Sequence, residues 1–164
     1  MRVLSQGAAA TATRVVRAAV PADAATLAPM CADHAIYERL PYSAAGHEQR
    51  LHSALASGQL HAWLLMDGEG GNAVGYASAT LDFATLSGQR FAHMDCLYLA
   101  PAARGQGGGQ LLVQAVLVFA RAQGCSTLQW QTPEWNVGAM RFYTRLGAIA
   151  SPKQRYTLEL EACE

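Results

Sequence analysis

The chain has 164 residues, of which 51% are hydrophobic and 15% charged, a balance typical of one compact globular protein rather than a disordered one. Lysine plus arginine and aspartate plus glutamate both count 12, so no net charge favours nucleic acid or an anionic membrane as a partner. No stretch approaches the roughly 20 apolar residues of a membrane-spanning helix, so we expect no membrane association.

The cysteines and histidines show neither a disulfide pattern nor a metal-binding pattern. Cys31, Cys96, Cys125 and Cys163 lie far apart and form no CxxC pair. Two of the four lie within apolar runs, so reduced thiols in a cytoplasmic protein fit better than a disulfide framework. The five histidines lack the paired spacing of a zinc site. We expect a cytoplasmic protein without a metal.

The N-terminal region is predicted to hold a tail, a strand and a helix. Residues 1–13 contain only a very short apolar core, so we expect a flexible tail, with a signal peptide as the alternative. The β-branched segment 14–20 predicts a strand. Within 21–40, Asp23 is placed to cap a helix, and Pro29 requires this helix either to start later or to bend.

A second helix and three strands are predicted next. Residues 43–58 have a helical pattern that ends at a glycine. Residues 61–66 and 72–83 are strand-like and flank a turn rich in glycine and aspartate, which predicts a β-hairpin. Residues 91–100 form the next predicted strand and lead directly into a glycine-rich segment.

The C-terminal region alternates helices and strands. Helical spacing covers 110–123, a strand is predicted at 126–132, a helix at 136–147 and a last strand at 155–160. The whole order is therefore β-α-α-β-β-β-α-β-α-β. We expect residues 14–164 to form one α/β domain, a mixed sheet covered by helices.

The segment RGQGGGQ (104–110), between a predicted strand and a predicted helix, is a candidate anion-binding loop. A P-loop would need Gly-Lys-Ser/Thr at the helix entry, and a dinucleotide fingerprint would need a glycine where Gln110 stands. What remains is R-x-x-G-x-G, formed by Arg104, Gly107 and Gly109. Helix N-terminal amides beside an arginine bind anions, although a tight turn explains these glycines almost as well.

A second motif decides between these readings. The segment EWNVGAMRFYTRLGA (134–148) contains Asn136, Ala139 and Tyr143. One predicted helix and one predicted strand separate it from the glycine loop. With both motifs in this order, the sequence resembles the GCN5-related N-acetyltransferase (GNAT) superfamily over roughly residues 14–160. The resemblance implies an acyltransferase with the GNAT fold, a mixed sheet of about six to seven strands with helices on both faces.

The same resemblance implies acetyl-CoA as co-substrate and assigns its contacts. The glycine loop would hold the pyrophosphate, the backbone of residues 97–99 would hold the pantetheine arm like an added strand, and Asn136 would bond that arm. The residues expected to contact acetyl-CoA are Leu97, Tyr98, Leu99, Arg104, Gly105, Gln106, Gly107, Gly108, Gly109, Gln110, Asn136 and Ala139.

Amide formation needs a neutral amine and a proton for the leaving thiolate. An alkylammonium has a pKa of about 10.4, so a base or desolvation must remove its proton. Asp95 lies in an apolar strand where a buried carboxylate is costly, and it aligns with the base of resembling enzymes, directly or through water. A carboxylate held by backbone amides or an arginine is the alternative. Tyr143 aligns with the family's catalytic tyrosine, the expected general acid.

Within the superfamily, three fragments resemble diamine (spermidine/spermine) and thialysine N-acetyltransferases: RAAVPADAATL, IYE and EWN…FY…GA. This resemblance implies a small-molecule primary amine as acceptor, with Tyr37, Glu38, Asp95 and Trp130 facing it. Lys153 stands near the last predicted strand, where the diamine enzymes carry an acidic residue. A smaller amine or an amino acid is therefore expected at least as much as a long polycation.

Two other functions remain open. The acceptor could be a protein N-terminus or lysine, or the chain could be a non-catalytic acyl-CoA-binding sensor. The resemblance also implies a homodimer.

Overall fold

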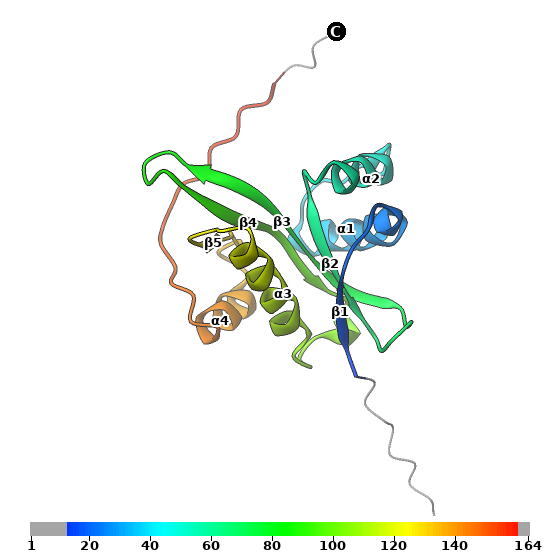
Figure 1. Cartoon of the computed structure of the whole chain (residues 1–164). Helices are drawn as coiled ribbons and strands as arrows, with labels where there is room; N and C mark the ends of the chain where they lie inside the picture. Colours follow the sequence, from blue (N-terminus) through cyan, green and yellow to red (C-terminus); the bar gives the residue numbers. More distant parts are fainter. Residues whose placement is uncertain (1–12, 161–164) are drawn as a thin grey trace, which may run out of the picture. The chain divides into compact units, whose positions relative to one another are not determined.

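The computed structural model of the protein describes residues 13–160, which form two compact units dividing after Gln131 (Figure 1). Cys163 and residues 1–12 of the predicted tail lie outside the described residues. The helices are α1 (Ala24–Glu38), α2 (His47–Ser57), α3 (Gly108–Ala122) and α4 (Val137–Arg145). The strands are β1 (Val15–Ala18), β2 (His61–Met66), β3 (Ala73–Ala84), β4 (Gln89–Leu99) and β5 (Leu128–Gln129).

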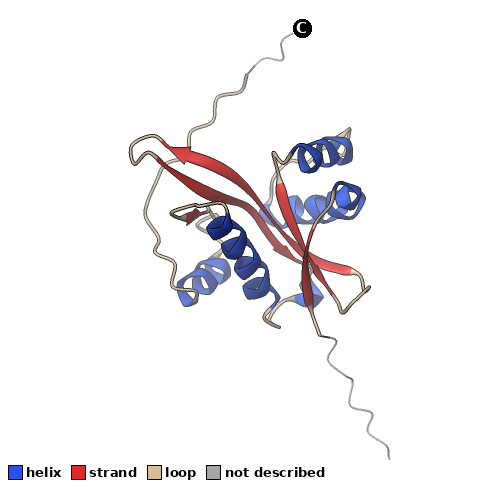
Figure 2. Ribbon diagram, viewed as in Figure 1, coloured by secondary structure: helices blue, strands red, loops and turns tan. Residues whose placement is uncertain are grey.

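The first unit is built on a mixed sheet in the order β1-β2-β3-β4-β5 (Figure 2). The first four strands are antiparallel neighbours, and β5 lies parallel to β4. This sheet confirms the predicted mixed α/β class, but within residues 13–160 it has five strands and not the predicted six to seven.

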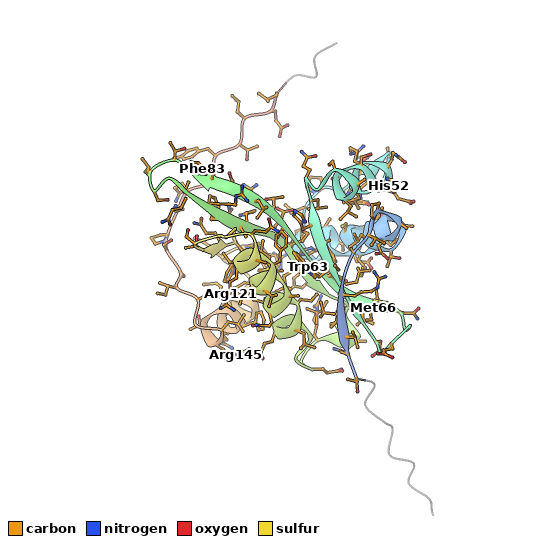
Figure 3. The ribbon with its side chains drawn as sticks, in the orientation of Figure 1. His52, Trp63, Met66, Phe83, Arg121 and Arg145 are labelled. Atoms are coloured by element: carbon orange, nitrogen blue, oxygen red, sulfur yellow. The ribbon has the colours of Figure 1, made fainter. Side chains whose placement is uncertain are left out.

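Helices cover both faces of this sheet because side chains alternate along β2. Ala62 and Leu64 pack with Leu27 of α1 on one face. Trp63 points to the other face, where its ring lies 5.2 Å from that of Phe119 in α3. Figure 3 shows Trp63 between the strands and α3 within the first unit.

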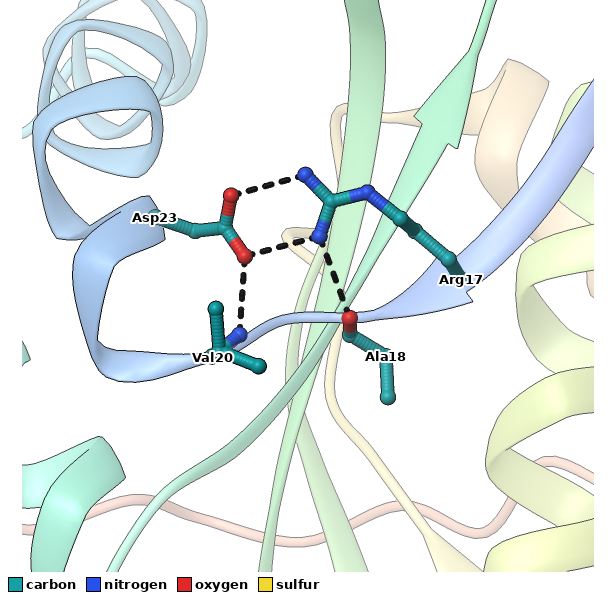
Figure 4. Close-up of polar contacts among 4 residues, drawn as sticks. All are labelled: Arg17, Ala18, Val20 and Asp23. Carbon is teal, nitrogen blue, oxygen red and sulfur yellow. Dashed lines mark hydrogen bonds and ion pairs between the residues drawn. The ribbon is translucent and has the colours of Figure 1, made fainter. Parts of the chain in front are cut away.

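Helix α1 begins at Ala24 and runs through Pro29, so the alternative of a later start was wrong. Asp23 stands at its N-cap position, but the Asp23 side chain does not cap α1. Its carboxylate instead accepts hydrogen bonds from Arg17 at 2.7 and 2.8 Å and from the Val20 amide at 2.8 Å (Figure 4). The predicted capping role was wrong because the Asp23 carboxylate is hydrogen-bonded to Arg17 of β1 instead.

Two predicted strands are shorter than expected or not formed. The strand predicted at 126–132 is reduced to Leu128–Gln129, and residues 151–160 form neither strand nor helix and are exposed. The prediction of a strand at 155–160 was therefore wrong. A strand forms only where a neighbour accepts its backbone hydrogen bonds, and no described strand pairs with this segment.

The second unit, from residue 132 on, contains α4 and is described by itself. No helix within residues 13–160 has the length and apolar character needed to cross a membrane. The expectation of one domain from 14 to 164 stays a prediction.

Candidate active site

Asp95 occupies a β-bulge in β4. Ser78 pairs with Cys96 and Ala79 pairs with Met94, so Asp95 is the extra residue between them. Such a bulge re-aims a side chain, and the Asp95 side chain is 62% exposed. The expected burial of this carboxylate was wrong, because the alternation that predicts burial is broken at the bulge. His93 Nε2 lies 3.9 Å from Asp95 Oδ1.

A cavity of about 230 Å³ opens beside this bulge, between helices α1 and α2 and strands β2 to β4. Its lining is mainly apolar, and it includes the two predicted substrate or catalytic carboxylates, Glu38 and Asp95. The structure thus brings together residues that lie 57 positions apart in sequence. Tyr37 and Trp130, also predicted to face the acceptor, are not among the lining residues.

Three polar side chains form a chain of contacts along this pocket. The Tyr76 hydroxyl lies 3.0 Å from His34 Nδ1, and His34 Nε2 lies 3.5 Å from Glu38 Oε1. Burial lowers the pKa of His34, partly opposed by Glu38, and burial strongly raises the pKa of Tyr76. His34 is therefore neutral and Tyr76 protonated at neutral pH.

The tautomer of His34 follows from its neighbours. A carboxylate only accepts hydrogen bonds, so the nitrogen facing Glu38 carries the proton. His34 Nδ1 then accepts from the Tyr76 hydroxyl. Sequence analysis missed His34, although its position four residues before Glu38 on one helix face was a usable signal.

The pocket thiols do not supply a nucleophile. Burial raises the pKa of Cys96 to about 12, and burial also raises the pKa of Cys31. Both thiols stay protonated at neutral pH, and a thiol is a poor nucleophile compared with a thiolate. The arrangement therefore favours chemistry that does not pass through an acylated cysteine.

The glycine loop follows β4 and is braced from the first strand. Arg14, just before β1, donates to the Ala103 carbonyl at 2.6 Å and to Gln106 Oε1 at 2.7 Å. Gln106 Nε2 also donates to the Ala102 carbonyl at 3.1 Å. The side chain of Gln106 thus holds the loop together. No local sequence pattern indicates this role of Arg14, because 92 positions separate it from Gln106.

Gly107 is the N-cap residue of α3; it has a left-handed conformation, with φ of 80°, and no side chain to cap the helix. The Leu111 amide bonds back to the Gly107 carbonyl at 3.3 Å. The amides of Gly108 to Gln110 precede that first turn, where helices carry amides without intrahelical acceptors. Together with the helix dipole, such a terminus suits an anionic group.

Arg104 joins two groups of predicted residues. Its Nε donates to the Leu99 carbonyl at 2.9 Å, and its guanidinium carbon lies 4.5 Å from the centre of the Tyr37 ring and 5.8 Å from that of Tyr98. These are cation–π distances. A residue predicted for the cofactor and one predicted for the substrate therefore meet at the end of β4.

Strand β4 has an open edge beyond the bulge. β5 pairs with it only at Ala92 and His93. Among residues 13–160, no strand pairs with Met94–Leu99 on that side. Residues 97–99, predicted to bind the pantetheine arm, lie on this edge, which can accept an extended ligand as an added strand.

In the second unit, Asn136 caps α4: its side chain accepts from the Ala139 amide at 3.2 Å. Tyr143 is half-buried on this helix, and its ring centre lies 5.3 Å from that of Phe142. The cap thus holds two predicted cofactor residues, Asn136 and Ala139, on the same helix as the predicted general acid.

No group of three or more metal-binding side chains occurs in the described part of the chain.

Comparisons with known proteins identify relatives of this chain. A model of the acetyltransferase (GNAT) family matches residues 28–148. The chain is 35% identical over 75 residues to a thialysine N-epsilon-acetyltransferase from Bos taurus, covering 46% of this chain and 44% of that protein. It is 28% identical over 126 residues to a protein of the same name from Caenorhabditis elegans, covering 75% of each.

The matches to the mammalian relatives from Bos taurus, Mus musculus and Sus scrofa span less than half the length of those proteins. The fold is also that of a crystal structure described as a probable acetyltransferase. The two superpose with a TM-score of 0.79 at 20% identity, over 90% of this chain and 99% of the other.

Proposed function

The chain belongs to the GNAT family of acetyltransferases, and from that premise we propose that it transfers the acetyl group of acetyl-CoA to the primary amine of a small molecule. One observation carries the proposal: the pocket that holds Asp95 and Glu38 opens beside the unpaired edge of β4. An amine bound at the carboxylates would then lie beside a ligand bound along that edge.

We propose that the glycine loop binds the pyrophosphate of acetyl-CoA through the amides of Gly108 to Gln110 and through Arg104. The open terminus of α3 and the brace from Arg14 support this role. The backbone of Leu97–Leu99 would bind the pantetheine arm, with an amide near Leu97 polarising the thioester carbonyl. When bound, acetyl-CoA supplies the activated acetyl group.

The acid and base roles are assigned to two residues. Asp95, directly or through water, accepts a proton from the ammonium group so that the nitrogen can attack. The exposed bulge position of Asp95 and its neighbour His93 support this role. Tyr143 donates a proton to the departing thiolate; its half-buried place on the capped helix α4 is compatible with that task. The protonated pocket thiols favour direct attack over an acyl-enzyme.

A cavity of about 230 Å³ holds one small molecule or one side chain, which is compatible with a small acceptor. The names of the thialysine acetyltransferase relatives are consistent with an amine group on a small molecule as the acceptor. A homodimer and a cytoplasmic location stay predictions, the first of which light scattering would test.

The test is a thiol-release assay with acetyl-CoA against polyamines, diamines, lysine analogues, aminoglycosides and short peptides. We expect turnover with at least one small amine and little with peptides. A peptide as the best substrate would favour a protein acetyltransferase instead. Tight CoA binding without turnover on any amine would favour the acyl-CoA-binding sensor and contradict the proposal.

A further inference from the structure

We infer that His34 is a positioning residue that holds the Glu38 carboxylate in the pocket as the counter-ion of the acceptor's ammonium group. The inference rests on the proposed function, because it assigns the pocket to the amine. It adds to that function a residue and a substrate class: an alkyl- or arylalkyl-ammonium with an apolar body.

The geometry defines a directed chain of hydrogen-bonding groups. The Tyr76 hydroxyl of β3 lies 3.0 Å from His34 Nδ1, and His34 Nε2 lies 3.5 Å from Glu38 Oε1, one helical turn further along α1. The His34 ring is buried and stacks at 5.2 Å on the ring of Tyr98. Tyr76 and Tyr98 therefore fix the imidazole in position and orientation, and the imidazole in turn holds the Glu38 carboxylate.

The charges of the pocket select a cation. Glu38 and Asp95 both line it, whereas no lysine or arginine is among its described lining residues. A carboxylate beside an apolar wall is costly when no cation balances its charge, and an ammonium group relieves that cost with a charge-assisted hydrogen bond. A substrate carboxylate in the same cavity would be repelled, so this pocket suits an amine with an apolar body better than an amino acid.

The groups that face His34 come from every element around it: Glu38 on α1, Tyr76 on β3, Asp95 and Tyr98 on β4, and Arg104 in the loop. Burial keeps His34 neutral in this setting, since its effect on the pKa outweighs the attraction of Glu38. A neutral imidazole donates to Glu38 without cancelling its charge. The carboxylate therefore remains a counter-ion for the ligand.

The experiment measures binding of n-hexylamine and of its neutral isostere hexan-1-ol to the full chain by calorimetry. The variants are Glu38→Gln, His34→Phe and the double variant. We expect each single variant to weaken hexylamine binding on the order of tenfold and to leave hexanol binding unchanged. If His34 acts through Glu38, the double variant binds hexylamine no worse than Glu38→Gln alone.

His34→Gln is the matched control, because its amide can still donate to Glu38. We expect it to recover hexylamine affinity to within a few-fold of the wild type, with CoA affinity and melting temperature showing that each variant is folded. Additive losses in the double variant, an equal loss of hexanol binding, or no rescue by a folded His34→Gln would each overturn the inference.

Calorimetry measures hexylamine binding without any acetyl transfer, so the proposed function and this inference can be contradicted independently of each other. If hexylamine binds with the expected dependence on His34 and Glu38 but no amine is acetylated, the proposed function falls and the ammonium site stands. If amines are acetylated but neither residue affects hexylamine affinity, the inference falls and the proposed function stands.

Discussion

Gly108, at the start of α3, lies directly against Leu65 of β2. A methyl group on Gly108 would overlap Cδ2 of Leu65 and come within 2.9 Å of Cδ2 of Leu99. Leu65 is fully buried and cannot move aside freely. The absence of a side chain at Gly108 thus lets the glycine loop and the helix terminus sit close to the sheet.

Gly108→Ala should therefore destabilise the protein and weaken CoA binding. Overpacking costs about 1–3 kcal/mol, against which the helix propensity of alanine returns at most about 1 kcal/mol. Thermal melting and calorimetry with CoA would measure both effects. Gly138→Ala, the same change within α4 where only Asn136 Oδ1 at 4.0 Å is near, should be neutral or stabilising. A Gly108→Ala variant as stable as the wild type would contradict the close packing.

The ion pair between Arg17 and Asp23 predicts acid sensitivity. Hydrogen bonding from Arg17 holds the pKa of Asp23 below its usual value of 3.8. A carboxyl group whose pKa is lowered by folding stabilises the protein above its unfolded pKa. That contribution is lost as the pH falls below 3.8 through the folded pKa.

Asp23→Asn should lower the free energy of unfolding at pH 7 by about 1–3 kcal/mol and flatten its dependence on pH below 4. Denaturant titrations at several pH values would show both changes. Asp33→Asn, which alters an exposed carboxylate of α1, should leave stability nearly unchanged. Equal losses in the two variants would argue against a special role for the Arg17 contact.

Asp95→Asn should lower kcat without changing CoA affinity, because an amide cannot accept the ammonium proton. Loss of a positioned base typically costs about 10²- to 10⁴-fold in rate. Steady-state kinetics with the best amine of the panel would measure it. Asp82→Asn, on the same hairpin but outside the pocket lining, is the matched control and should retain activity. Full activity in Asp95→Asn would remove it from the mechanism.

Tyr143→Phe should reduce turnover by a similar factor while CoA affinity is kept, since only the hydroxyl proton is lost. Comparing kcat with the Kd for CoA separates the two effects. Tyr156→Phe, which alters a tyrosine that is 90% exposed, should behave as the wild type. If both tyrosine variants remained fully active, the proton would have to come from another group.

The neutral state of His34 makes amine binding depend on pH. Burial lowers the pKa of His34 below its usual 6.5, so a protonated imidazole forms only under more acidic conditions. Once protonated, it can no longer accept from Tyr76 and repels an ammonium ligand. Hexylamine affinity should therefore decline as the pH falls through the lowered pKa of His34, and NMR titration of the imidazole would locate it.

The lowered pKa of His34 also makes the stability of the protein depend on pH. The unfolded chain takes up a proton at His34 below about 6.5, before the folded chain does, so stability should fall with pH from there down to the folded pKa. His34→Gln should reduce this dependence and leave the part due to His47 and His61, whose pKa values burial also lowers, whereas His52→Gln, on an exposed part of α2, should keep it. An unchanged profile in His34→Gln would contradict the buried neutral histidine.

The local pattern of the sequence determined most elements. β2 was predicted at its observed bounds, 61–66, and α2 ended as predicted at Gly58, because period-2 alternation and a left-handed glycine are properties of neighbouring residues. The cap of α4 by Asn136 was likewise readable, since the contact spans only three residues. The two motifs and their order identified the family.

Only the tertiary structure decided which distant residues meet. The bulge that exposes Asp95 is a register shift between two strands, and the brace from Arg14 to Gln106 joins residues 92 positions apart. Neither can be read from periodicity, because each depends on a partner elsewhere in the chain. The same reason explains why an alternating segment at 155–160 forms no strand, and why Tyr76, His34 and Glu38 become one chain of contacts: pairing and packing are set by neighbours in space.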